Sequence, residues 1–363
     1  GSSSEKSASS SSFPKGSCVV TESDACEIHI VLVAARYAPK ARVVSVCPTS
    51  GALLCVKRPR RGWGNDEEEE RVFFASDLDA LTYLKELGKV KNATRGTCVL
   101  GIARLGDQVA ALVATKVQKA MRLPTGEDVF RICETKWIKT TSISSPVRQL
   151  TEQEKEHARA LMDFPIDGLH FYSETFDLRK SLAFRDSSRS SSLASPPPKE
   201  EEEKEESEWV WNEAIAKPLR DVLDDDASRY VPVMIQGLAE CREILVDATD
   251  PKKGSWHFAV FGKRSRLHPG TRFLARGINE DGNPGNEVEM EQMVWRSSNG
   301  NSSGRNSGRK KTIWTSYVWR RGSVPLRWKQ EIKQTVGDAQ IEVETKDTYK
   351  NAERYFARLR KSY

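Results

Sequence analysis

Residues 263–328 constrain the fold of this 363-residue chain more than any other stretch, because they include a run in which charged and uncharged side chains alternate with a period of two. Residues 287–292 read Glu-Val-Glu-Met-Glu-Gln, so glutamates alternate with apolar or amide side chains. That alternation is typical of a half-buried strand with an acidic face. Proline, glycine and asparagine gather at 267–270 and again at 279–285, where they favour chain reversals. The stretch therefore predicts two β-hairpins.

The same stretch is rich in arginine, and two interpretations of these side chains stay open. Because residues at i and i+2 on a strand share a face, Arg264 and Arg266 are expected to point the same way, as are Arg272 and Arg276. In the first interpretation they form ion pairs with the glutamates of a neighbouring strand, each worth roughly 0.2–1 kcal/mol. In the second they bind phosphate, whose oxygens a guanidinium group matches bidentately. The candidates for anion contact are Arg264, Arg266, Arg272, Arg276, Arg320 and Arg321.

Three motifs in this stretch resemble, in the same order, those of the Sac (suppressor of actin) domain of phosphoinositide phosphatases. The first is Lys-Arg-Ser-Arg at 263–266, continued by Gly-Thr-Arg at 270–272 and Arg-Gly at 276–277. The second is Asn-Glu-Val-Glu-Met-Glu-Gln at 286–292, and the third is Arg-Gly-Ser-Val-Pro-Leu-Arg-Trp at 321–328. Their details are most similar to the large plant-type Sac proteins that also carry a WW domain.

The resemblance extends to earlier segments and implies a fold and a domain plan. Cys-Val-Leu-Gly-Ile-Ala at 98–103 resembles a strand of the amino-terminal Sac hairpin, and Trp-Val-Trp-Asn at 209–212 resembles a helix start of the family. The implied fold is α+β or α/β: a β-rich amino-terminal Sac subdomain, then the first part of an α/β Cys-phosphatase-like catalytic domain. The expected division is a disordered segment at 1–17, the Sac subdomain at 18–186, a disordered Ser/Pro and acidic linker at 187–207, and the catalytic part at 208–363.

The resemblance also implies an activity, the hydrolysis of phosphate from phosphatidylinositol phosphates by a cysteine thiolate in a Cys-x5-Arg loop. The chain reaches Tyr363 without that loop, so we expect an amino-terminal fragment that lacks the nucleophile and is inactive alone. Cys55 and Arg61 have the spacing, but the proline between them removes a backbone donor. Cys98 and Arg104 also have it, but they enclose an apolar strand core. Neither pair is expected to hold a phosphate.

Composition limits the partners. The net charge of +6 arises from 57 basic and 51 acidic residues, which favours an anionic partner. We expect phosphoinositide lipids at a membrane surface, no nucleic acid, and possible protein partners bound through the disordered insertions. The seven cysteines show no Cys-x-x-Cys pair and the five histidines share no ligand spacing, so no metal or cofactor is expected. No signal peptide or apolar run of about 18 residues occurs, so we expect a cytoplasmic protein peripheral to endomembranes or the plasma membrane.

Two other classes of function stay open. A Sac fold can serve as a non-catalytic phosphoinositide-binding or scaffold protein, and a general protein-interaction module could act through the disordered insertions. An intact Cys-x5-Arg loop in a longer protein would favour catalysis over the scaffold. Absence of any headgroup preference in lipid binding would favour the interaction module.

Elsewhere the pattern predicts short strands up to residue 147 and several helices. Ser76 is a suitable N-cap for a helix at 77–87, and helices are also expected at 150–162 and 209–223. Residues 231–238 and 256–261 are expected to be buried strands. The first helix should bury a leucine stripe made of Leu78, Leu81, Leu84 and Leu87. A last helix, beyond residue 344, should present Tyr349, Ala352, Tyr355, Phe356 and Leu359 on one face.

Overall fold

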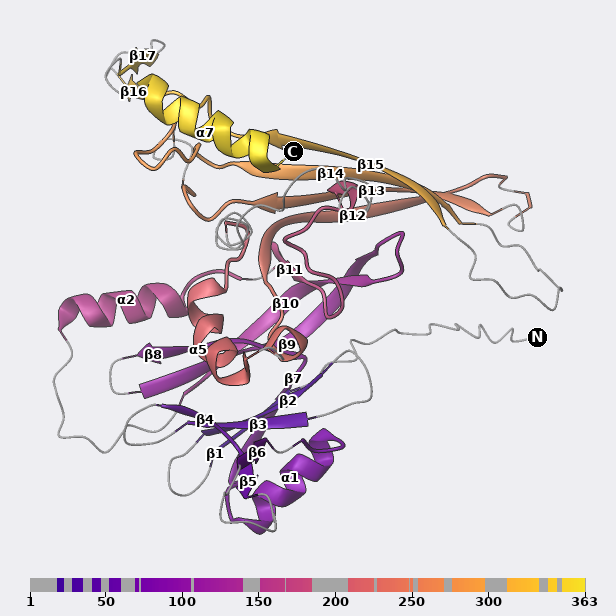
Figure 1. The fold of residues 1–363 in the computed structure, drawn as a ribbon, viewed down its shortest axis with the longest axis vertical. Helices are drawn as coiled ribbons and strands as arrows, with labels where there is room; N and C mark the ends of the chain where they lie inside the picture. Colours follow the sequence, from indigo (N-terminus) through magenta and orange to yellow (C-terminus); the bar gives the residue numbers. More distant parts are fainter. Residues whose placement is uncertain are drawn as a thin grey trace, which may run out of the picture.

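Two antiparallel sheets, stacked along the long axis of the molecule, form most of the structure (Figure 1). The β-rich fold predicted from the sequence is therefore confirmed. The computed structural model describes residues 18–22, 28–34, 41–46, 52–59, 69–71, 73–105, 108–139, 151–166, 168–184, 208–224, 227–247, 249–250, 254–270, 276–297, 312–332, 339–344 and 348–362. The segments 1–17 and 187–207, which the sequence predicts to be disordered, lie outside these ranges.

The smaller sheet has five strands in the order β4-β3-β2-β1-β7. Their sequences are rich in valine and isoleucine, which favour extended backbone because they branch at Cβ. Both faces of this sheet are buried, one against a helix and the other against the larger sheet. Its strands are β1 (Cys18–Glu22), β2 (Ile28–Val33), β3 (Ala41–Val46), β4 (Leu53–Cys55) and β7 (Asn92–Gly96).

The larger sheet has eight strands, and each strand after the first pairs with the strand that precedes it in the sequence. Its first four strands precede residues 187–207 and its last four follow them. The predicted domain division at this segment stays a prediction. The last four strands form a long twisted ribbon at the top of Figure 1. The strands are β8 (Cys98–Leu105), β9 (Gln108–Arg122), β10 (Asp128–Lys139), β11 (His170–Tyr172), β12 (Ile235–Leu245), β13 (Ser255–Arg264), β14 (Val288–Ser297) and β15 (Ile313–Arg321).

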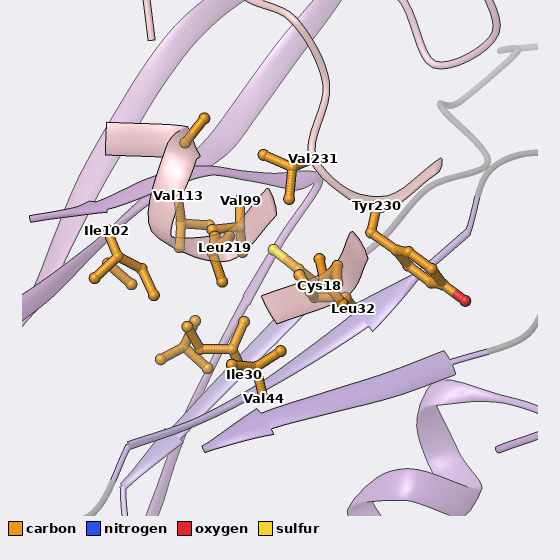
Figure 2. Close-up of a cluster of buried hydrophobic side chains, with 14 of the residues drawn as sticks. Cys18, Ile30, Leu32, Val44, Val99, Ile102, Val113, Leu219, Tyr230 and Val231 are labelled. Atoms are coloured by element: carbon orange, nitrogen blue, oxygen red, sulfur yellow. The ribbon is translucent and has the colours of Figure 1, made fainter. Parts of the chain in front are cut away.

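A continuous apolar core joins the two sheets. Ile30 and Val44 of the smaller sheet face Val99 and Val113 of the larger one, and Leu219 closes the layer from helix α5 (Glu213–Leu223; Figure 2). Gly101 lets this helix approach strand β8, because a Cβ there would lie 2.5 Å from the backbone of Ile215. Two small hairpins complete the strands: β5 (Lys57–Pro59) with β6 (Glu69–Arg71), and β16 (Trp328–Ile332) with β17 (Ala339–Val343).

The helices start largely where the sequence predicts. Helix α1 (Asp77–Glu86) is capped by Ser76, whose hydroxyl accepts the Asp79 amide, and α2 (Glu152–Met162) carries a capping box and buries no residue. Helix α5 (Glu213–Leu223) accommodates a proline and is followed by α6 (Ala227–Tyr230). A 3₁₀ turn, η1 (Leu182–Phe184), and the last helix, α7 (Thr348–Ser362), complete the fold.

Three burial predictions were wrong in part. In α1 the buried residues are Ala80, Leu81 and Leu84, whereas the leucines at both ends of the stripe are half or more exposed. In α7 only Ala352 and Tyr355 of the expected apolar face are buried, while Tyr349 and Phe356 are exposed. In the strands expected to be buried, Leu238 and Trp256 are exposed, because they lie on the outer face of the larger sheet.

Candidate functional site

The three Sac-like motifs meet on three adjacent strands. Strand β13 ends with the first motif, β14 carries the alternating glutamates, and β15 ends at the third motif. Lys263 lies opposite Glu289, and Glu289 lies opposite Arg320 on the next strand. Residues far apart in the sequence are thereby brought into one row, basic–acidic–basic.

The glutamates of this row do not form the half-buried acidic face that the sequence predicts. They point inward, where Glu287, Glu289 and Glu291 are only 2–4% exposed. A buried carboxylate is costly unless it has partners. Glu287 and Glu289 form ion pairs and accept hydrogen bonds, and Glu291 accepts hydrogen bonds. We use the name buried charge cluster for Glu208, Lys263, Glu287, Glu289, Arg320 and Arg358.

Glu289 is the centre of the buried charge cluster. Its Oε1 lies 2.8 Å from Lys263 Nζ and accepts a 2.6 Å hydrogen bond from the Ser181 hydroxyl. Its Oε2 lies 3.1 Å from Arg320 Nε. Burial alone would raise the pKa of Glu289, but the two cations outweigh it and lower the pKa to about 2. Glu289 is therefore ionised throughout the physiological range.

Glu208 has the opposite character, although it shares the same arginine. Its Oε1 lies 3.3 Å from Arg320 Nη1, and its side chain is only 3% exposed. Burial raises the pKa of Glu208 to about 7, a shift that Arg320 opposes and Glu287 reinforces. Glu289 lies closer to Arg320 than Glu208 does, and it also pairs with Lys263. The ionised form of Glu208 is therefore less stabilised than that of Glu289.

Glu287 connects the cluster to helix α7. The Tyr355 hydroxyl donates a 2.7 Å hydrogen bond to Glu287, and Arg358 Nη2 lies 3.8 Å from the same carboxylate. Burial and the nearby Glu287 charge raise the pKa of Tyr355, which keeps it a neutral donor. Glu291 is satisfied differently, by the backbone amides of Leu182 and Ala183 and by the Ser316 hydroxyl.

Trp209 packs over both cations of the cluster. Its ring centre lies 5.3 Å from Lys263 Nζ and 5.0 Å from Arg320 Cζ, distances at which the electron-rich ring face attracts a cation. Trp209 is itself buried. The cluster is therefore closed by an aromatic side chain and forms part of the protein interior.

The candidate arginines separate into different environments. Arg320 belongs to the buried charge cluster, as the ion-pair interpretation predicted, whereas Arg321 is exposed on the other face of β15. Arg264 donates to Gln236 Oε1 at 3.0 Å and also to Asn286. The backbone amide of Arg266 donates to the Glu208 carbonyl at 2.9 Å.

The prediction that Arg272 and Arg276 share a strand beside the glutamates was wrong in its pairing. Strand β14 pairs with β13 and β15, and Arg276 lies in the loop between β13 and β14, where its guanidinium stacks 5.1 Å from the Trp328 ring centre. Arg272 lies outside the described residues. Long loops obscure strand pairing in a sequence, because period-two alternation identifies a strand but not its neighbour.

Sequence reasoning missed Lys263, Glu208 and Tyr355 as members of this network. Lys263 carried a usable signal: it occupies the same alternating phase of β13 as Ala259 and Phe261, both buried. A lysine in an apolar phase requires a buried partner. Glu208 and Tyr355 carried no local signal, because their partners are 68 or more residues away.

Metal binding and nucleophilic catalysis by Cys98 find no support in the described part of the chain. It contains no group of three or more His, Cys, Asp or Glu residues arranged to hold a metal ion. Burial raises the pKa of the Cys98 thiol well above its usual value, which makes it a poor nucleophile. Within the same residues, no helix has the length and apolar character required to cross a bilayer.

The pKa of Glu208 predicts a pH dependence of stability. The folded state binds its proton more tightly than the unfolded state, whose pKa is 4.5, so Glu208 contributes a fall in stability as pH rises from about 4.5 to about 7. In Glu208→Gln this contribution should vanish, and the variant should gain stability relative to the parent across that window. Urea unfolding midpoints at several pH values measure the difference. Glu134→Gln, in an exposed ion pair, is the control, and a Glu208→Gln profile parallel to the parent would contradict the assignment.

Comparison with known proteins agrees with the three motifs. Residues 97–363 match the SacI homology domain family. The polyphosphoinositide phosphatase of Schizosaccharomyces pombe is 25% identical over 300 residues, which are 81% of this chain and 33% of that protein. Phosphoinositide phosphatase SAC5 of Arabidopsis thaliana is 28% identical over 282 residues, 77% of this chain and 33% of that protein. The chain thus spans about a third of the length of these curated relatives, and it belongs to the SacI homology domain family.

Proposed function

We propose that this chain is the amino-terminal part of a phosphoinositide phosphatase, and that its nucleophilic Cys-x5-Arg loop lies in a longer polypeptide beyond Tyr363. The observation that carries the proposal is the match of residues 97–363 to a family whose relatives are named phosphoinositide phosphatases. In this proposal the residues from 208 onward begin an α/β catalytic domain. In the same proposal the protein is cytoplasmic and peripheral to endomembranes or the plasma membrane, and its substrates are phosphoinositides at the membrane surface.

The position of each motif residue relative to the buried charge cluster supports two different roles for these residues. Lys263, Glu289 and Arg320 are directed into the protein, where they hold three motif strands in register. Arg264 and Arg321 lie on the opposite face, in one row separated by Val288. We therefore assign Arg264 and Arg321 to the recognition of headgroup phosphate and Arg320 to the scaffold.

Adjacent arginines then give opposite phenotypes. Arg320→Ala should lower the melting temperature by several degrees, because it leaves buried carboxylates short of a partner. Arg321→Ala should leave the melting temperature unchanged within error, because the side chain is exposed, and should weaken binding of vesicles that contain phosphoinositides. Thermal melts and vesicle co-sedimentation of both variants measure the contrast. Equal effects of the two substitutions on binding, after correction for folding, would contradict the assignment.

The enzyme proposal is tested by phosphate release from short-chain phosphoinositides. We expect none from the 363-residue chain and release from the longer protein, with loss of that activity when the loop cysteine is replaced by serine. Phosphate release by the 363-residue chain would overturn the placement of the nucleophile. A longer protein that binds phosphoinositides and releases no phosphate would favour the non-catalytic scaffold instead.

A further inference from the structure

Glu208 lies beneath the first Sac-like motif, on the inner side of the larger sheet. Its backbone carbonyl accepts the Arg266 amide at 2.9 Å, and the backbone carbonyl of Glu287 accepts the Ser265 amide at 2.8 Å. Both acceptors belong to residues of the buried charge cluster. The backbone of the motif is therefore bonded directly to the cluster, and a change of charge in the cluster occurs next to the motif.

Arg264 lies on the other face of the same strands, in one row with Arg321. Trp211, three residues after Glu208, holds it there: the Trp211 indole Nε1 donates to the Arg264 carbonyl at 2.9 Å, and the Arg264 guanidinium lies 5.8 Å from the ring centre. The Glu208 side chain is only 3% exposed. A single layer of sheet thus separates its carboxylate from the arginines that we assign to phosphate.

The buried charge cluster is electrically balanced when all its groups are ionised. Its groups are three cations and three carboxylates: Lys263, Arg320, Arg358, Glu208, Glu287 and Glu289. The charges that face Glu208 come from β14, β15 and α7 and belong to Glu287, Glu289, Arg320 and Arg358. Lys263 of β13 acts on it through Glu289, and Tyr355 of α7 acts through Glu287. One added proton therefore leaves the cluster with a net positive charge.

Glu208 accepts such a proton more readily than Glu289. Burial raises the pKa of Glu208 to about 7. For Glu289 burial is outweighed by Lys263 and Arg320, which lower the pKa to about 2. Of these two carboxylates, Glu208 is the one that takes up a proton as the pH falls through neutrality. The cluster thus gains positive charge within the physiological range of pH.

We propose that Glu208 controls headgroup binding through its charge: ionised, it opposes phosphate at Arg264 and Arg321, and uptake of a proton strengthens binding there. This inference rests on the proposed function. A negative charge behind the arginine row repels a phosphate in front of it. The path between the two charges runs through the protein instead of through water, so the repulsion is screened less than between exposed groups.

The expected size of the effect follows from the geometry. With one sheet layer between them, the two charges are about 10 Å apart, the usual distance across packed sheet layers. At that distance two unit charges change an affinity about twofold at an effective dielectric constant of about 80, and about fifteenfold at about 20. Phosphate monoesters carry between one and two charges near neutral pH, which enlarges the effect. The coupling is reciprocal, so a bound headgroup raises the pKa of Glu208 in turn.

The test compares Glu208→Gln with the parent chain in binding to phosphatidylcholine vesicles that contain phosphatidylinositol phosphate, at low ionic strength. Glutamine is uncharged at every pH, so at about pH 8 the variant should bind at least about twofold more tightly, and at about pH 5 the two should be equal within error. Each comparison is made at one pH, which cancels the titration of the headgroup phosphate itself, whose second pKa is about 6. Loss of a purely structural contact would weaken binding instead.

Glu86→Gln is the matched control, because Glu86 is exposed on α1, at the opposite end of the molecule from β13 (Figure 1). It should bind like the parent at both pH values. Binding by Glu208→Gln that is no tighter than that of the parent at the higher pH, or that is tighter by the same factor at the lower pH, would overturn this inference alone. Absence of headgroup-dependent binding by the parent at every pH would reject the proposed headgroup site and this inference with it.

A direct titration gives an independent readout. The carboxyl resonance of Glu208 in the nuclear magnetic resonance spectrum is identified by its loss in Glu208→Gln. It should titrate at a higher pH in the presence of a soluble inositol phosphate than in its absence, because bound phosphate raises the pKa of Glu208. An unchanged midpoint, in a sample that binds the inositol phosphate, would contradict the coupling.

Discussion

Replacing Glu289 with alanine is expected to lower the free energy of unfolding by about 3–5 kcal/mol, the usual cost of removing one partner from a buried ion pair. The substitution leaves Lys263 and Arg320 buried, each with a cationic group that has lost its closest carboxylate. Small domains are stable by only about 5–15 kcal/mol, so a large share of the stability would be lost. Urea unfolding followed by tryptophan fluorescence measures the change.

Three further variants identify the cause of that loss. Glu289→Gln keeps the shape and the acceptor for Ser181, so a loss similar to that of alanine would show that charge matters more than packing. Glu134→Ala, in an exposed pair with Lys116, should change stability by less than about 1 kcal/mol. Replacement of Lys263 and Glu289 together by methionine should recover part of the stability, because Arg320 keeps Glu208 and Glu287 as partners. Wild-type stability of Glu289→Gln would refute the ion-pair account.

The second large effect is expected at Asn212, which is fully buried at the start of helix α5. Its Nδ2 donates to the carbonyls of Leu100 and Pro232 at 2.8 and 3.0 Å, and its Oδ1 accepts the Met234 amide at 2.9 Å. Asn212→Ala leaves three buried backbone groups without these partners, at about 1–3 kcal/mol each. We expect a loss of about 3 kcal/mol or more in urea unfolding.

Matched variants make the Asn212 result specific. Asn212→Asp keeps the acceptor for Met234 and removes both donors, so it should be at least as destabilising as alanine. Asn92→Ala, at an exposed position of β7, should stay within about 0.5 kcal/mol of the parent. A small loss for Asn212→Ala would show that the backbone groups find other partners, and the amide would then have no structural role.

The sequence predicted the parts of this fold that depend on neighbouring residues. Period-two alternation identified the strand of the three glutamates, and Ser76 with Asp79 identified the start of α1, because those signals act over a few residues. The exposure of the glutamates could not be predicted the same way. Their burial depends on Ser181, Arg320 and Tyr355, which the fold brings from three separate segments.

The candidate site shows the same limit. All six arginines were selected by residue type and motif, yet Arg320 and Arg321 are adjacent in the sequence and lie on opposite faces of one strand. Their phase could be assigned only once the pairing of β15 with β14 was known, because a shift of one residue in register exchanges the two faces. Motif resemblance therefore identified the family, and strand register decides which side chain reaches an anion.

The neighbour-to-neighbour order of the larger sheet has a consequence for how the protein is made. Every strand from β9 to β15 pairs with the one translated just before it, so no strand has to wait for a partner that the ribosome has not yet released. Chains fold progressively from the amino terminus during synthesis. The sheet can thus lengthen at one edge during translation, and the newest strand is then the next template for growth.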